Sequence, residues 1–324
     1  MNMEHQNTQQ IKNKIEASLL GFAVGDALGV PVEFINRERL AAHPVSQMCG
    51  GGSHGQPAGT WSDDTSMTLC MMDSLAEKGI DYADQMNRFA DWLWNGTNTA
   101  HGETFDVGIT TKNAVLSFGR GTPALECGET AEFSCGNGSL MRMLPVAWYL
   151  MKKGFPAKLT EETAAVIHNA SKCTHAHPRC LLACGIYCSV VFALFLSHSL
   201  EEAITMGISS ALDYYQAKPA FQGFLPEFFS LRELASWPGE KLSGSGYVLH
   251  TLQSSLWCLL HSTCYRDCVL TAVNLGEDTD TTAAVAGGLA GLWYGTSSIP
   301  EQWLSALAKR EELSQRAQWF WEKI

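Results

Sequence analysis

Residues 274–291 (NLGEDTDTTAAVAGGLAG) join an acidic, hydroxyl-rich front to a back end of small apolar residues. The back end predicts a buried helix whose glycines let a neighbouring segment approach closely. The front cannot simply extend that helix, because Asp278 and Asp280 would then point about 200° apart. We therefore expect Asp278 to Thr281 to form a turn that starts the helix and brings both carboxylates to one place.

Oxygen-bearing side chains at a buried helix start suit a hard cation, but Asp and Thr are also common N-cap residues and need no metal. A second cluster, Ser62-Asp63-Asp64, again stands directly before an apolar helical pattern. Two such helix starts favour a shared purpose over two independent caps. The positive end of each helix dipole also favours ionised carboxylates there.

The composition limits what the chain can bind. Its 324 residues are 46% hydrophobic and 17% charged, so a large core can form, and the net charge is −11. With no basic run, the sequence argues against a nucleic-acid partner, since phosphate neutralisation dominates such binding. The eleven cysteines are odd in number, lack C-x-x-C spacing and follow a polar N-terminus, so we expect reduced thiols in a cytoplasmic protein.

The helical patterning predicts an all-α fold with a single domain at residues 11–324, preceded by a flexible leader at residues 1–10. No stretch alternates long enough to indicate a strand. The apolar run at residues 181–196 is shorter than the roughly 20 residues needed to cross a bilayer, so we expect a central helix and no membrane partner. Further helices are expected at residues 11–28, 82–93, 110–118, 160–170, 246–261, 265–273, 303–313 and 315–321.

Isolated polar residues have mostly structural interpretations. Asp26 lies inside the apolar N-terminal helix, where a buried Asp most often accepts hydrogen bonds. Glu33 follows in the exit turn of that helix, between two apolar residues, which favours partial burial. The Gly-rich loop at 36–60 is either functional or merely a mobile excursion. A glycine loop at 134–145 opens a helix and can cradle a phosphate.

The acidic residues predict a metal centre if they meet. Glu33, Asp63, Asp64, Asp278 and Asp280 carry five negative charges, which nearly balance two divalent cations. Without cations, repulsion would be costly or would force protonation. The oxygen donors match Mg²⁺ or Mn²⁺, and the absence of histidine from both clusters argues against zinc or non-haem iron. Paired ions can hold vicinal oxygens, polarise them and activate a water.

Several segments, in order along the chain, resemble the ADP-ribosylglycohydrolase family, in particular its bacterial members of the dinitrogenase-reductase-activating type. The paired acidic motifs are specific in this order, whereas the glycine loop alone is not. The similar segments are residues 25–34 (GDALGVPVEF), 61–65 (WSDDT), 137–142 (NGSLMR), 174–175 (TH), 246–252 (GYVLHTL) and 276–281 (GEDTDT).

The resemblance implies an orthogonal all-α bundle that binds two Mg²⁺, with Mn²⁺ possible, and hydrolyses the N-glycosidic bond between ADP-ribose and a protein side chain, usually arginine. The partners would be an ADP-ribosylated protein and the product ADP-ribose. The family commonly has Thr at the position of Ser62, so we expect looser pre-organisation of that hydroxyl. The implied residues are Ser62, Asp63, Asp64, Asp278, Asp280 and Thr281 as metal ligands, with Glu33 reaching the site, and Asp106, Asn137, Gly138, Ser139, His175 and Tyr247 in substrate binding. Our hypothesis for catalysis is that Glu33 or an aspartate such as Asp64 or Asp280 transfers the protons, and the sequence does not fix which carboxylate does so.

Two other functions remain open from the sequence. A dinuclear-metal phosphoesterase would use similar carboxylates, although such sites usually include histidine. A family member that binds ADP-ribose without turning it over would keep the fold. Cys173, His175 and His177 are close in sequence but lack a second ligand pair, which argues against a zinc site there.

Overall fold

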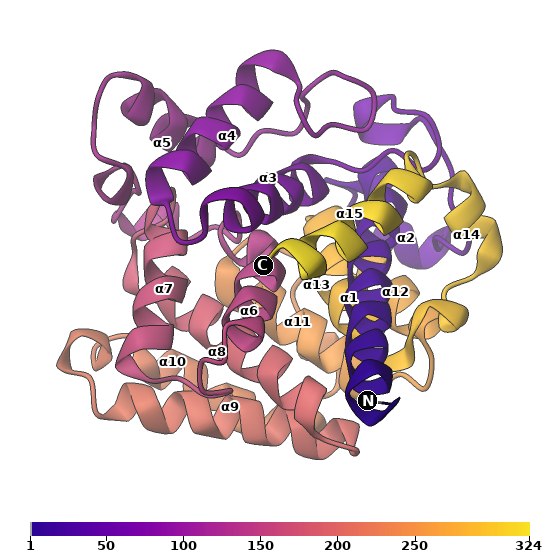
Figure 1. Cartoon of the computed structure of the whole chain (residues 1–324). Helices are drawn as coiled ribbons and strands as arrows, with labels where there is room; N and C mark the ends of the chain where they lie inside the picture. Colours follow the sequence, from indigo (N-terminus) through magenta and orange to yellow (C-terminus); the bar gives the residue numbers. More distant parts are fainter. Residues whose placement is uncertain (1) are drawn as a thin grey trace.

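The computed structural model describes residues 2–324, with side chains from residue 9 onward. The described chain forms α-helices joined by loops and short 3₁₀ turns, and its only β pairings are isolated bridges. The predicted all-α class is confirmed (Figure 1). The helices are α1 (Asn2–Gly29), α2 (Arg37–Ala42), α3 (Asp63–Lys78), α4 (Tyr82–Asn95), α5 (Ile109–Gly119), α6 (Leu144–Lys152), α7 (Glu161–Lys172), α8 (Pro178–Leu196), α9 (Leu200–Gln216), α10 (Leu225–Phe228), α11 (Val248–Leu260), α12 (Tyr265–Val273), α13 (Thr279–Tyr294), α14 (Glu301–Ala306) and α15 (Arg310–Lys323).

The most extensive helix pairing joins α1 to α13, so the first long helix packs against one near the end of the chain. Glycines make this close crossing possible. A Cβ added to Gly25 would lie 2.1 Å from the carbonyl oxygen of Ala283, and one added to Gly21 would lie 2.5 Å from that of Gly287. The predicted glycine-lined contact of both helices is therefore confirmed.

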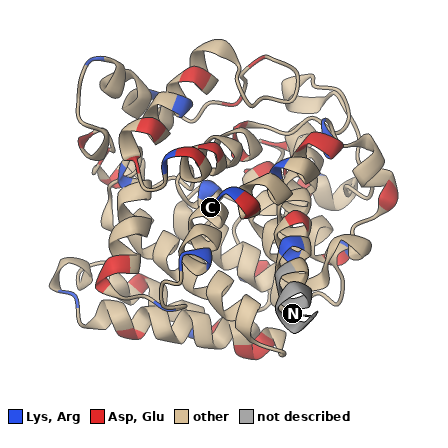
Figure 2. Ribbon diagram, viewed as in Figure 1, with Lys and Arg blue, Asp and Glu red and all other residues tan. Residues whose placement is uncertain are grey.

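Helix α8 is the predicted central helix. It packs against α9, α7 and α11, and its residues from Cys180 to Leu194 are buried. Two helical stretches, Gln9–Val32 and Pro178–Leu196, are long and apolar enough to cross a membrane by length and composition, but they are 89% and 83% buried within the bundle. Figure 2 shows basic residues scattered among acidic ones over the helices seen in that view.

Some predicted boundaries were wrong. Helix α1 already begins at Asn2, not near Ile11; whether residues 1–10 move independently stays a prediction, and Met1 lies outside the described residues. The final helices break at 307–309, because Lys309 adopts a left-handed conformation with a φ of 53°, so α14 is shorter and α15 longer than predicted. All eleven cysteines are free, as expected for reduced thiols.

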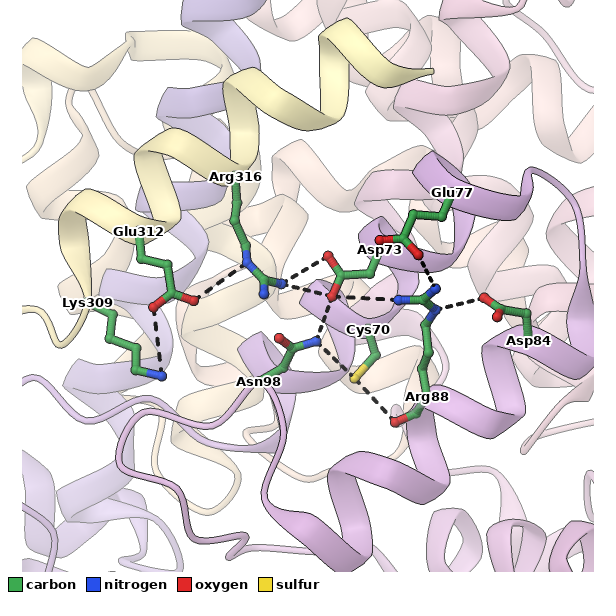
Figure 3. Close-up of polar contacts among 9 residues, drawn as sticks. All are labelled: Cys70, Asp73, Glu77, Asp84, Arg88, Asn98, Lys309, Glu312 and Arg316. Carbon is green, nitrogen blue, oxygen red and sulfur yellow. Dashed lines mark hydrogen bonds and ion pairs between the residues drawn. The ribbon is translucent and has the colours of Figure 1, made fainter.

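A polar network fixes α15 across α3 (Figure 3). Asp73 of α3 accepts hydrogen bonds from Arg316 at 3.0 and 2.9 Å and from Asn98 at 2.9 Å. Arg88 of α4 lies 4.0 Å from the same carboxylate and also binds Asp84 and Glu77. The network therefore ties the C-terminal helix to the helix that carries one of the acidic turns.

Candidate metal and substrate site

The turn after α1 and the turn before α13 are docked to each other through their backbones. The N–H of Phe34 donates to the carbonyl of Glu277 at 2.6 Å, and the N–H of Glu277 donates to that of Ile35 at 2.7 Å. Phe34 and Glu277 both have positive φ angles, 66° and 62°. This paired arrangement places the side chains of Glu33 and Asp278 next to each other.

Helix α13 begins one residue after Asp278, at Thr279. The predicted turn over Asp278 to Thr281 is therefore shorter than expected, because Asp280 and Thr281 already belong to the first helical turn. The two carboxylates still converge, since Asp278 has a non-helical φ of −91° and ψ of 76°. The prediction that both carboxylates meet at the start of the helix is confirmed, but the helix begins at Thr279, inside the predicted turn.

The other acidic turn is held by Asp26. Its buried carboxylate accepts hydrogen bonds from the N–H of Ser62 at 2.8 Å and from the N–H and hydroxyl of Thr65 at 3.1 and 2.6 Å. Ser62 in turn caps α3 by accepting a hydrogen bond from the N–H of Asp64 at 3.3 Å. Asp26 therefore has the structural role expected from the sequence, and it fixes α1 against the start of α3.

Both acidic turns meet in one cluster. Carboxylate oxygens of Asp26, Asp64 and Asp280 lie within 4.8 Å of one another, and so do those of Glu33, Asp278 and Asp280. Burial and mutual repulsion raise the pKa of Asp64 and Asp280 well above its ordinary value. Residues from opposite ends of the chain therefore build a single, strongly acidic centre.

A pocket of about 240 Å³ opens onto this cluster. Asp64 and Asp280 do not line the pocket and are fully buried beneath it, and Ser62 is almost fully buried. Eight of the predicted catalytic, substrate and metal residues are thus at the wall, together with other residues of the glycine loop and the start of α5. The lining residues are Glu33, Asp63, Asp106, Gly108, Ile109, Thr110, Thr111, Gly136, Asn137, Gly138, Met141, His175, Asp278 and Thr281.

The glycine loop joins this wall through Asn137. The side-chain amide of Asn137 donates to Asp278 at 2.9 Å and to Thr251 at 2.9 Å. Gly138 lies against the ring of His175, since an added Cβ would be 2.8 Å from Cε1. The side chain of Asn137 therefore links the loop directly to the acidic centre.

Arg142 holds the glycine loop from behind. Its guanidinium is fully buried and donates to the carbonyls of Gly138 and of Ala170 and to the hydroxyl of Thr174. The hydroxyl of Thr174 lies 2.7 Å from Nδ1 of His175. Burial lowers the pKa of His175 to about 3, so this imidazole is neutral and can serve the pocket as a hydrogen-bonding group without charge.

Two predicted substrate contacts lie away from the pocket wall. The hydroxyl of Ser139 is fully buried, 2.8 Å from that of Ser171 and 3.5 Å from the thiol of Cys184, so it belongs to the core beneath the loop. Tyr247 does not line the pocket, and its hydroxyl donates to Glu227 at 3.1 Å. A backbone bridge pairs Tyr247 with Gly136, which keeps Tyr247 beside the glycine loop.

His54 was not singled out from the sequence, yet its Nε2 contacts the carboxylate of Glu33. It comes from the Gly-rich loop at 36–60, whose possible function was left open. Neither sequence cluster contains a histidine, but the fold adds one beside Glu33 from this distant loop. Glu33, His54 and Asp106 each place one donor atom within 4.8 Å of the others.

The family model for ADP-ribosylglycohydrolases matches residues 7–324. The chain belongs to the ADP-ribosylglycohydrolase family. ADP-ribosylarginine hydrolase Tri1 of Pseudomonas putida (strain GB-1) is 31% identical over 313 residues, which cover 96% of this chain and 78% of that protein. The ADP-ribosyl-[dinitrogen reductase] glycohydrolase of Rhodospirillum rubrum is 32% identical over 318 residues, covering 95% of each.

The fold agrees with this family. A solved structure described as an ADP-ribosylglycohydrolase-related protein complex superimposes with a TM-score of 0.77 and 29% sequence identity, and the match covers 97% of this chain and 99% of that one. The resemblance inferred from the acidic motifs is therefore confirmed, as is the enzyme class that it implied.

The residues of this ADP-ribosylglycohydrolase fit divalent cations. Three buried carboxylate oxygens, Oδ1 of Asp64, Oδ1 of Asp278 and Oδ2 of Asp280, have no hydrogen-bond partner among the described residues. A buried polar atom without a partner costs free energy, and several buried carboxylates cannot all stay ionised without a compensating charge. Hard oxygen donors of this kind select Mg²⁺, Mn²⁺ or Ca²⁺ over softer metals.

Proposed function

We propose that this protein hydrolyses the N-glycosidic bond between ADP-ribose and an arginine side chain of a modified protein, releasing ADP-ribose. The convergence of both acidic turns at the floor of one pocket carries this proposal. Relatives whose names specify ADP-ribosylarginine or ADP-ribosylated dinitrogen reductase support the choice of substrate. The protein would thereby reverse mono-ADP-ribosylation.

We further propose that the acidic centre holds two Mg²⁺, which Mn²⁺ can replace. The ligands would come from both helix starts. When bound, the cations would neutralise the carboxylates and polarise oxygen atoms of the substrate ribose. The proposed ligands are Ser62, Asp63, Asp64, Asp278, Asp280 and Thr281.

Residues of the pocket wall would transfer the proton and bind the rest of the substrate. Hydrolysis breaks the bond from ribose C1 to the guanidine nitrogen, adds the hydroxyl of water to C1 and delivers a proton to the nitrogen. Glu33 lies at the pocket wall beside Asp278 and Asp280, so its carboxyl group is placed to deliver that proton. Asn137, Gly138 and the neutral His175 line the wall where the ribose and diphosphate would lie.

The direct test is release of ADP-ribose from an ADP-ribosylated arginine protein. With Mg²⁺ the wild-type protein is expected to release ADP-ribose, and EDTA is expected to stop the reaction. A matched serine-linked substrate tests the choice of acceptor. Release of inorganic phosphate without ADP-ribose would favour a phosphoesterase, and binding of ADP-ribose without turnover would favour a non-catalytic member.

The variants Asp64→Asn and Asp280→Asn test the metal centre. Each removes one buried charge but keeps the side-chain volume. We expect activity to fall at least about 100-fold, on the scale of losing a group essential to catalysis. In EDTA, thermal unfolding of either variant should occur at a higher temperature than that of the wild type, because repulsion is relieved. A variant with near-normal turnover would contradict the proposed centre.

A further inference from the structure

Three successive residues of one loop contact the turn that carries Glu33. We call residues 50–56 the His54 loop. Gly52 approaches so closely that an added Cβ would lie 1.7 Å from the carbonyl oxygen of Pro31. The hydroxyl of Ser53 donates to the carbonyl of Glu33, and Nε2–H of His54 donates to Oε2 of the same residue. The loop therefore forms hydrogen bonds with both the backbone and the side chain of Glu33.

The shape of the His54 loop is defined by its backbone. Gly52 and Gly55 have φ angles of 64° and 66°, a region that side chains with a Cβ rarely enter. The N–H of Gly51 donates to the carbonyl of Gln56 at 2.7 Å and closes the loop. This short closed loop presents His54 in one direction, toward Glu33.

Two aromatic rings contact the imidazole of His54. The ring centroid of His54 lies 5.8 Å from that of Phe34 and 5.2 Å from that of Phe105. Phe34 is 72% exposed and sits at a positive φ of 66°, so burial in the core does not account for its position. Its contact with the imidazole gives this exposed ring a local role.

The Glu33 carboxylate depends on His54. Among the hydrogen bonds of the described residues, His54 supplies the only side-chain donor to that carboxylate. Its other close neighbours include the carboxylates of Asp106, Asp278 and Asp280, which repel an ionised Glu33. Without the donor from His54, the glutamate side chain would be free to turn out of the pocket.

We propose that His54 is a positioning residue that holds the Glu33 carboxylate toward the substrate pocket, with Phe34 and Phe105 fixing the imidazole. The inference rests on the proposed function, because Glu33 acts there on the departing guanidine. It gives a function to the Gly-rich loop and to the two phenylalanines that contact His54. His54 itself need not touch the substrate.

The test compares three replacements of His54. His54→Gln places an amide N–H at the position of Nε2, His54→Asn carries the same group on a shorter side chain, and His54→Leu removes it. We expect kcat for ADP-ribose release to fall about 10–100-fold in His54→Leu and His54→Asn, since a misplaced catalytic group costs that much. In His54→Gln, kcat should recover to within about fivefold of wild type, and KM should stay within about twofold in all three.

A structural readout separates this inference from the proposed function. Crystal structures of His54→Leu and His54→Gln should show Glu33 turned away in the first and directed into the pocket in the second. His43→Leu, at an exposed histidine that follows α2, is the matched control and should have the activity of the wild type. An unmoved Glu33 in His54→Leu, or a His54→Gln variant as slow as His54→Leu, would overturn the inference. An inactive wild type would instead refute the proposed function.

Discussion

Gly246 shows how tightly single residues enclose the acidic centre. Its carbonyl accepts the N–H of Asn137 at 3.1 Å, and a Cβ added to it would lie 2.5 Å from Oδ2 of Asp278. Gly246 is outside the left-handed region, since it is absent from the glycines with positive φ. An alanine here would therefore act through the carboxylate and not through backbone strain.

We predict that Gly246→Ala weakens binding of Mn²⁺ about 10-fold, the lower end of the effect of disturbing groups that orient metal ligands. The added methyl displaces Asp278 and breaks its hydrogen bond from Asn137. Calorimetric titration with Mn²⁺ measures the change. Gly223→Ala is the control, because an added Cβ there meets no atom within 4 Å. Equal affinities for the two variants would contradict the assignment of Asp278 as a ligand.

At the scale of elements, the sequence predicted those helices whose patterns are local. The small-residue helix at 283–291 and the carboxylates directly before α3 and α13 could be read directly, because burial and capping follow from neighbouring residues. His54 could not be read this way. Its loop has no periodicity, and its position depends on a contact between Gly52 and Pro31 that joins distant segments.

Side-chain direction was the other property that the sequence could not supply. Ser139 belongs to a glycine loop rightly placed at the pocket, yet its hydroxyl points into the core. In a loop without regular secondary structure, successive side chains follow no fixed pattern of direction. The sequence therefore cannot show which side chain of the loop points into the pocket and which points into the core. The break before α15 was missed for a related reason, since Lys309 takes the left-handed conformation without being glycine.

The polar network between α3 and α15 makes a prediction at this scale. Asp73→Ala should lower the free energy of unfolding by about 2 kcal/mol, because it leaves the partly buried Arg316 and Arg88 without a shared carboxylate. Urea unfolding measures this. Asp213→Ala breaks an exposed pair with Arg232 and should change the same quantity by less than about 0.5 kcal/mol. Equal effects would mean that the network does not fix α15.

At the scale of the whole molecule, stability should depend on pH through His168. Its Nε2 lies 2.8 Å from the hydroxyl of Tyr215, and burial lowers its pKa from 6.5 to about 4. Between these values the unfolded chain binds a proton that the folded chain excludes, so stability is lost as the pH falls from about 6.5 to about 4.

We predict that the low pKa of His168 contributes about 2 kcal/mol to the free energy of unfolding at pH 7, after a reduction for the partial exposure of its side chain. Urea unfolding of wild type and His168→Gln at pH 7, 5 and 4 measures it. The neutral glutamine variant should be less stable than wild type at pH 7, and the gap should narrow as the pH falls. A gap that is constant with pH would show that His168 already titrates normally in the folded protein.

The pairing of α1 with α13 has a consequence for synthesis. During translation, Asp26, Glu33, Asp63 and Asp64 leave the ribosome long before Asp278 and Asp280. The nascent chain therefore exposes the glycine face of α1 and half of an acidic centre until the last helices arrive. A polypeptide that terminates before α13 lacks Asp278 and Asp280 and cannot assemble the catalytic pocket.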